Sequence, residues 1–129
     1  MKYANISGVP DFTATEYASR QSDYALCIPI INEGDRIERE LARAQSAGIG
    51  RFVDVIICDG GSTDGSTDDA VLKAAGVNTL LVKTGAGRQG AQLRMGLWWA
   101  LQRGYKGIVT IDGNDKDSIE SVPLFVEKL

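Results

Sequence analysis

Three aspartates lie within six residues near the end of the sequence, directly after an apolar segment. The apolar segment, residues 108–111, reads Ile-Val-Thr-Ile and is typical of a buried strand; Asp112, Asp115 and Asp117 follow it. Like charges this close repel one another unless water or a cation screens them. Mg²⁺ and Mn²⁺ bind one or two carboxylates together with substrate phosphates. We therefore expect Asp112 and its neighbours to bind such a cation; the alternative is a solvated acidic turn before a helix.

A further acid, Asp59, also ends an apolar run, and glycine, serine and threonine residues follow it. A carboxylate at the end of a strand can accept hydrogen bonds from a base N–H or a ribose hydroxyl, each contributing roughly 1.5–3 kcal/mol. The glycines after it allow a flat ligand to approach the backbone. Two alternatives stay open: an N-cap or Asx-turn for Asp59, and a charged first helical turn for Glu33.

Two arginines, Arg88 and Arg94, lie at the start of a helical segment and within it. Phosphates bind at helix N-termini and to bidentate arginine side chains, so both are candidates for phosphate binding. A solvated surface charge is the alternative for Arg94. Gly85, Gly87 and Gly90 have the spacing of a dinucleotide-binding fingerprint, but they follow the third strand, and the acid expected about 20 residues later lies in a different context. We do not expect an NAD site.

Composition restricts the remaining chemistry. The sequence contains no histidine, which excludes a Ser-His-Asp triad, a Cys-His pair and a histidine-based zinc site. Cys27 and Cys58 lie in apolar runs and are expected to pack as small hydrophobic residues. A formal net charge of −3 is unlike a basic nucleic-acid-binding surface, so no nucleic-acid partner is expected. No run approaches the ~20 apolar residues of a membrane span, and we expect a cytoplasmic domain.

The elements that must position these residues alternate along the chain. Residues 1–22 are polar and unpatterned and are expected to form an N-terminal extension, and residues 23–129 to form one α/β domain. Apolar runs predict four strands, and helical periodicity with glycine stops predicts four helices. The expected strands cover residues 24–31, 52–59, 78–83 and 108–112, and the expected helices cover residues 34–47, 66–75, 91–103 and 118–128.

This order predicts a mainly parallel sheet with helices on both faces, because strands buried on both sides read as continuous apolar runs. In open parallel sheets, ligands bind outside the carboxyl ends of the strands. The polar residues identified above fall on those ends. We therefore expect Glu33, Asp59, Arg88 and Asp112 to surround one crevice.

Four segments together resemble the nucleotide-binding half of a family 2 glycosyltransferase with the GT-A fold. They are residues 29–33 (PIINE), 55–66 (VIICDGGSTDGS), 90–97 (GAQLRMGL) and 111–114 (IDGN). The resemblance runs from about residue 24 to the end of the sequence, and its motifs are most similar to those of dolichyl- or polyprenyl-phosphate sugar transferases. It implies a Rossmann-like GT-A fold, a three-layer α/β/α sandwich, and transfer of a sugar with inversion from a nucleoside-diphosphate donor, UDP- or GDP-linked.

The resemblance also implies roles for individual residues. Asp112 would be the first acid of an Asp-x-Asp metal motif, with Asn114 in place of the second acid and Lys116 where a glutamine is common. Asn114 is an uncharged oxygen ligand, so the affinity for Mg²⁺ or Mn²⁺ should be lower. The expected substrate-binding residues are Pro29, Ile31, Glu33, Asp59, Gly61, Ser62, Arg88, Gly90, Arg94, Asp112 and Gly113.

The second half of this family holds the acceptor and the catalytic base, so we expect that base beyond Leu129 and expect the present chain to be a donor-binding part. A lipid phosphate or a saccharide is the expected kind of acceptor. Membrane association of a longer protein and homodimer formation stay open. The alternative function is a non-catalytic nucleotide-binding module of the same fold, with Asn114 marking lost catalysis.

Overall fold

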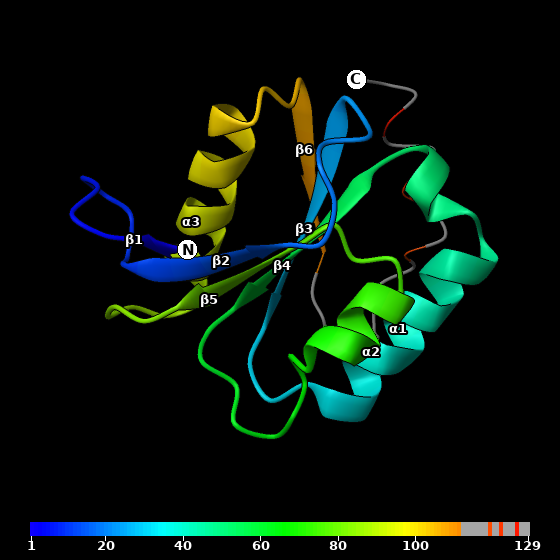
Figure 1. The fold of residues 1–129 in the computed structure, drawn as a ribbon, viewed down its shortest axis with the longest axis horizontal. Helices are drawn as coiled ribbons and strands as arrows, with labels where there is room; N and C mark the ends of the chain where they lie inside the picture. Colours follow the sequence, from blue (N-terminus) through cyan, green and yellow to red (C-terminus); the bar gives the residue numbers. More distant parts are fainter. Residues whose placement is uncertain (112–118, 120–121, 123–125, 127–129) are drawn as a thin grey trace.

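The computed structural model describes residues 1–111 together with residues 119, 122 and 126. Within this part, a mixed six-stranded sheet has the strand order β1-β2-β5-β4-β3-β6 (Figure 1). The strands are β1 (Lys2–Tyr3), β2 (Phe12–Glu16), β3 (Tyr24–Ile30), β4 (Asp54–Asp59), β5 (Thr79–Lys83) and β6 (Gly107–Thr110). The helices are α1 (Gly34–Ser46), α2 (Asp69–Ala74) and α3 (Gln89–Gln102), with a 3-10 turn, η1, at Ile49–Arg51.

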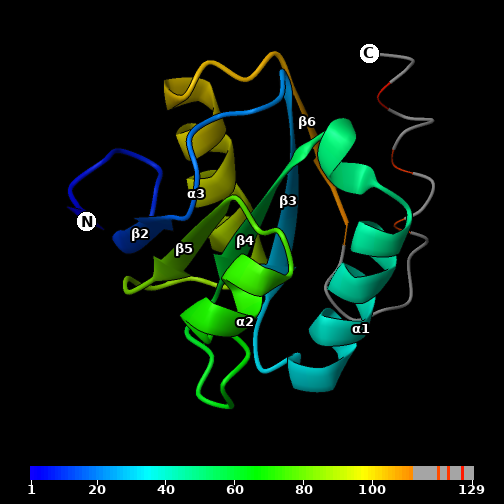
Figure 2. The ribbon, with the colours of Figure 1, turned by 45° about the vertical axis from the view of Figure 1, so that its right-hand side comes forward.

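The four strands expected from the apolar runs are parallel and adjacent: β4 and β6 both pair with β3, and β5 pairs with β4. The chain moves outward from β3 to β4 and β5, and then crosses back to place β6 on the other side of β3. Helices α1 and α2 lie on one face of the sheet and α3 lies on the other (Figures 1 and 2). The α/β class and the mostly parallel sheet are therefore confirmed, and the arrangement is compatible with a small Rossmann-like domain.

Each face of the sheet carries its own apolar core, which explains the continuous apolar runs of the central strands. Alternate residues of β3 point to opposite faces: Leu26 and Ile28 pack towards α1, whereas Cys27 packs beneath α3. Cys58 joins Cys27 in that second core, and both thiols are buried and free, as expected. The hydrogen bond with Cys27, together with burial, raises the pKa of the Cys58 thiol.

The expectation for residues 1–22 needs correction, because this segment contributes two strands to the sheet. Strand β2 pairs antiparallel with β5, and β1 pairs antiparallel with β2. Phe12 and Ala14 are buried at alternate positions of β2, and the Phe12 ring packs with the rings of Tyr3 and Trp99. Two apolar residues at period two form too short a pattern to stand out in a polar segment.

Two helix starts also differ from the sequence expectation. Helix α2 begins at Asp69 instead of residue 66, because the side chain of Asp68 accepts a hydrogen bond from Val71 N and caps the helix there. Helix α3 begins at Gln89, two residues earlier than expected. The helix expected over residues 118–128 lies outside the described residues, apart from three positions.

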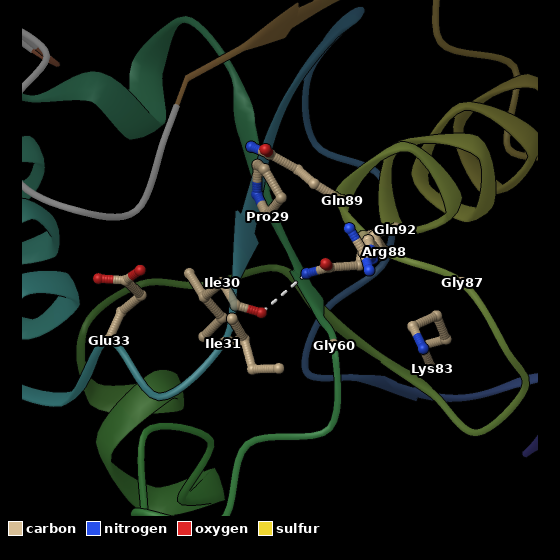
Figure 3. Close-up of a pocket in the computed structure, with 10 residues that line it drawn as sticks. All are labelled: Pro29, Ile30, Ile31, Glu33, Gly60, Lys83, Gly87, Arg88, Gln89 and Gln92. Carbon is tan, nitrogen blue, oxygen red and sulfur yellow. Dashed lines mark hydrogen bonds between the residues drawn. The ribbon is translucent and has the colours of Figure 1, made fainter.

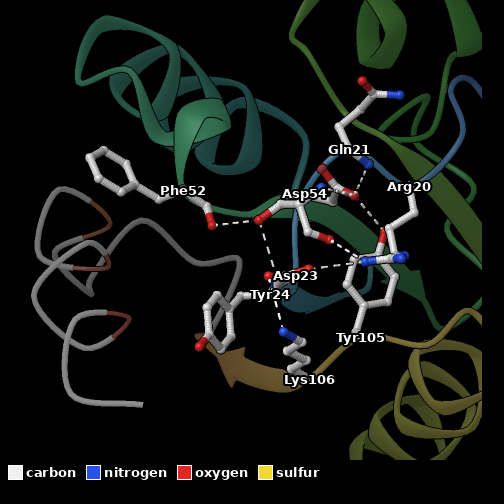
Figure 4. A network of polar contacts seen from close by, with 9 residues as sticks. Arg20, Gln21, Asp23, Tyr24, Phe52, Asp54, Tyr105 and Lys106 are labelled. Atoms are coloured by element: carbon white, nitrogen blue, oxygen red, sulfur yellow. Dashed lines mark hydrogen bonds and ion pairs between the residues drawn. The ribbon is translucent and has the colours of Figure 1, made fainter.

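A buried polar network ties the amino ends of the strands together, at the edge opposite the polar strand ends (Figure 4). Asp54, the first residue of β4, accepts hydrogen bonds from Gln21 N at 2.8 Å and from the Tyr105 hydroxyl at 2.6 Å. Burial, and then this bond to Asp54, raise the pKa of Tyr105. These groups satisfy one another, so the network fixes the segment before β3. In the described part of the chain, no helix has both the length and the apolar character to cross a membrane.

Candidate functional site

A pocket of about 400 Å³ opens at the carboxyl ends of β3, β4 and β5, beside the first turn of α3 (Figure 3). Parallel strands bring these ends to the same edge of the sheet, although the segments are far apart in the sequence. The pocket is lined by Pro29, Ile30, Ile31, Glu33, Gly60, Lys83, Gly87, Arg88, Gln89 and Gln92.

The structure brings together some of the residues expected at the site and not others. Pro29, Ile31, Glu33 and Arg88 line the pocket. Five expected residues are not among its lining residues: Asp59, Gly61, Ser62, Gly90 and Arg94. Asp112, Gly113 and Asn114 lie outside the described residues. Six lining residues were not among the expected site residues: Ile30, Gly60, Lys83, Gly87, Gln89 and Gln92.

Asp59 is occupied within its own loop. The side chain is only 1% exposed, and Oδ2 accepts hydrogen bonds from Gly61 N at 2.9 Å and Ser62 N at 2.8 Å. The Ser62 hydroxyl donates to the other carboxylate oxygen. The structure thus places Asp59 in the turn role that the sequence left open as an alternative. Its neighbour Gly60 lines the pocket instead.

The polar residues after β4 also hold the loop after β3. Ser62 Oγ accepts a hydrogen bond from Asn32 N at 2.8 Å, and Asn32 has a positive φ of 48°. Gly34 N donates to Ser66 Oγ at 2.9 Å and to Asp64 Oδ2 at 3.2 Å. The hydrogen bond from the Ser66 hydroxyl lowers the pKa of the Asp64 carboxyl. These bonds join the two loops, so one wall of the pocket is preformed.

Glu33 supplies the acidic group of the pocket. Glu33 Oε2 is buried and forms an ion pair with Arg36 Nε at 2.8 Å. The Arg36 side chain is about half exposed, which weakens the ion pair by solvent screening. A carboxylate has about four lone-pair sites, so Glu33 can still accept a hydrogen bond from a hydroxyl or N–H group of a ligand.

Two cationic side chains, Lys83 and Arg88, lie on the opposite side of the pocket from Glu33 (Figure 3). Lys83 Nζ donates to Gly85 O at 2.9 Å. Within the described part of the chain, no residue pairs with the Arg88 guanidinium. Arg88 is also the N-cap residue of α3, and its side chain makes no capping hydrogen bond. An uncapped helix start beside two cations is suited to an anionic ligand group.

Gln92 joins α3 to the strand ends. Its side chain is buried, and Nε2 donates hydrogen bonds to Ile30 O at 2.8 Å and Cys58 O at 2.9 Å. These carbonyls belong to the ends of β3 and β4, so the amide fixes the start of α3 over the pocket. A polar residue one turn into an apolar helix is the sequence signal for this contact, but the sequence does not show which carbonyls it meets.

Arg94 points away from the pocket. Its Nε donates to Gly8 O at 2.9 Å and so connects α3 to the N-terminal segment. Gly90 is exposed, and a Cβ added there would have Arg94 Nη1 as its nearest atom, at 3.5 Å, which is an ordinary contact. Neither residue contributes to the pocket wall.

No protein-family model matches the chain, and no curated protein matches it either. Among the described residues, no group of three or more aspartate, glutamate or cysteine side chains is placed to hold a metal ion. The expected ligands Asp112 and Asn114 are outside this part of the chain.

Proposed function

We propose that this chain is the donor-binding part of a glycosyltransferase similar to family 2, with a GT-A fold, and that its pocket binds a nucleoside-diphosphate sugar. The observation that carries the proposal is the position of the pocket, at the carboxyl ends of three adjacent parallel strands and at the start of α3. This is where open α/β sheets bind nucleotides. Three of the four sequence segments that resemble the family contribute lining residues to the pocket: residues 29–33, 55–66 and 90–97.

The chemistry of the pocket corresponds to the parts of such a donor. Pro29 and Ile31 provide an apolar surface for a flat ring, and Ile31 is 53% exposed there. Glu33 can accept a hydrogen bond from a ribose or sugar hydroxyl. Lys83 and Arg88 offset the negative charge of a diphosphate, and a guanidinium binds phosphate oxygens in a bidentate manner.

The proposed reaction is transfer of the sugar with inversion to an oxygen atom of the acceptor, and the nucleoside diphosphate is the leaving group. Asp112 and Asn114 would hold Mg²⁺ or Mn²⁺, which supplies charge stabilisation for the departing diphosphate. Lys83 and Arg88 act on the same negative charge from the protein. The proposed acceptor is a lipid phosphate, which attacks through a phosphate oxygen, or a saccharide, whose hydroxyl a base must deprotonate.

A non-catalytic nucleotide-binding module is the second candidate, and one observation favours it. Asn114 stands where the metal motif of the resembled family has an acid, and an uncharged ligand binds a divalent cation less strongly. Both candidates require the pocket to bind a nucleotide. They differ in whether a divalent cation strengthens that binding.

Isothermal titration calorimetry with UDP and GDP, each with and without Mn²⁺, tests the proposal. We expect Arg88→Ala to weaken binding by about 10- to 100-fold, because a charge-assisted hydrogen bond contributes roughly 1.5–3 kcal/mol. Arg94→Ala is the matched control and should bind as the unmodified chain does. We expect Mn²⁺ to strengthen binding and Asp112→Ala to remove only that increase. Absence of binding by either nucleotide, with and without Mn²⁺, would end the proposal.

A further inference from the structure

The orientation of the Gln92 amide is chemically determined. Its nitrogen lies 2.8 Å from Ile30 O and 2.9 Å from Cys58 O, and both partners are backbone carbonyls. Carbonyl oxygens only accept hydrogen bonds, so the NH₂ group must face them and use both of its hydrogens there. The amide oxygen, Oε1, cannot exchange places with the nitrogen without losing both hydrogen bonds and setting an acceptor oxygen against two carbonyl oxygens.

The fixed Oε1 is available to a ligand. Gln92 is 5% exposed and lines the pocket, and no described residue donates a hydrogen bond to Oε1. The amide lies flat against Gly60: a Cβ at that residue would be 3.0 Å from Cδ, 3.1 Å from Nε2 and 3.1 Å from Oε1. A side chain at Gly60 would therefore push the amide off the strand ends.

The other acceptors near the pocket do not compete for the same ligand atom. The Asp59 carboxylate is occupied by the N–H groups of Gly61 and Ser62 and by the Ser62 hydroxyl. The Glu33 carboxylate lies across Ile30 and Ile31 from Gln92 (Figure 3). Gln92 thus offers the pocket a neutral acceptor that two hydrogen bonds hold in place.

We propose that Gln92 Oε1 selects the nucleobase of the donor by accepting a hydrogen bond from a ring N–H. Uracil at N3 and guanine at N1 carry such a hydrogen, whereas cytosine and adenine present a lone pair at the corresponding ring position. A lone pair facing Oε1 repels it and leaves both groups without a hydrogen bond. This inference rests on the proposed function, since it assigns one contact within the proposed donor pocket.

Ligand pairs test this contact without changing the protein. In calorimetric titrations we expect UDP to bind at least about 10-fold more tightly than CDP, and GDP at least about 10-fold more tightly than ADP. UDP methylated at N3 carries a methyl group in place of the donor hydrogen and should bind as weakly as CDP. Equal affinities for UDP and CDP, or for UDP and its N3-methyl form, would overturn the inference and leave the donor pocket standing. Failure of every nucleotide to bind would remove both proposals.

A matched pair of variants identifies the responsible residue. Gln92→Met keeps the length of the side chain and removes its acceptor, and we expect the ratio of the CDP and UDP dissociation constants to fall to near one. Gln102→Met changes an exposed glutamine at the far end of the same helix, away from the pocket, and should keep the ratio of the unmodified chain. A Gln92→Met variant that is folded, by circular dichroism and thermal melting, and still prefers UDP would contradict the assignment. If this variant does not fold, the ligand pairs decide alone.

Discussion

At the scale of single residues, Asp59 and Glu33, the acids near the carboxyl ends of β4 and β3, differ in the interactions that their carboxylate oxygens already make. Asp59 receives three hydrogen bonds from its own loop and is almost completely buried. Glu33 forms one ion pair, with Arg36, and lines the pocket. Both were expected to contact the ligand, but only Glu33 is among the lining residues. Asp59 acts on the site by holding the two loops in place.

This difference predicts a stability effect at Asp59. Asp59→Ala should lower the free energy of unfolding by about 3 kcal/mol, because it leaves two backbone N–H groups and a hydroxyl without their charged partner. Urea unfolding followed by circular dichroism measures the loss. Asp35→Ala, an exposed aspartate in the first turn of α1, is the control and should cost less than about 1 kcal/mol. An Asp59→Ala chain that is as stable as the unmodified one, but binds nucleotide more weakly, would restore Asp59 as a ligand contact.

At the scale of elements, the position of α3 determines the shape of the pocket. The Gln92 amide holds the first turn of the helix to the ends of β3 and β4. Further along, Gly96 lies directly over the cysteines, since a Cβ there would be 2.7 Å from Cys58 Sγ and 3.3 Å from Cys27 Sγ. The helix therefore approaches the sheet closely through most of its length.

We expect Gly96→Ala to lower the free energy of unfolding by about 1–3 kcal/mol, because the added methyl group overpacks the core beneath α3. Helix propensity alone would predict the opposite sign, since alanine is better than glycine within a helix by about 0.5–1 kcal/mol. Gly90→Ala in the same helix is the control: its Cβ would meet no atom closer than 3.5 Å, so it should cause no loss. Denaturant unfolding compares the two variants.

A double variant shows whether the sulfur atom causes the loss. Cys58→Ala removes the atom nearest to the new methyl group, so Gly96→Ala should cost less in that background than alone. Additive losses in the double-mutant cycle would show that overpacking against Cys58 is not the reason.

At the scale of the whole molecule, the N-terminal segment completes both the sheet and the cationic side of the pocket. Strand β2 covers the edge of β5. Just before it, Asp11 O accepts hydrogen bonds from Thr84 N at 2.8 Å and Gly85 N at 2.9 Å. These bonds hold the loop that carries Arg88. Segments far apart in the sequence thus meet at the same side of the fold.

Phe12→Ala should lower the free energy of unfolding by about 3–5 kcal/mol, because this completely buried ring is shared by β2, β1 and α3. Thr15→Ala on the exposed side of the same strand should change it by less than about 0.5 kcal/mol. Chemical denaturation measures both. A Phe12→Ala variant with unchanged stability would mean that residues 1–16 are dispensable, as the sequence pattern alone suggests.

The sequence by itself determined the elements whose burial follows from a long run of apolar residues. The four parallel strands, the buried cysteines and the meeting of Glu33 and Arg88 at one edge follow from apolar runs and from the geometry of parallel sheets. Strands β1 and β2 were not predicted, because their apolar pattern is too short. Which atoms a polar residue contacts was decided only by the tertiary structure: Asp59 turns into its own loop, and Gln92 reaches carbonyls 62 and 34 residues away. Hydrogen-bond partners depend on distances between distant segments, and periodicity within one segment carries no information about those distances.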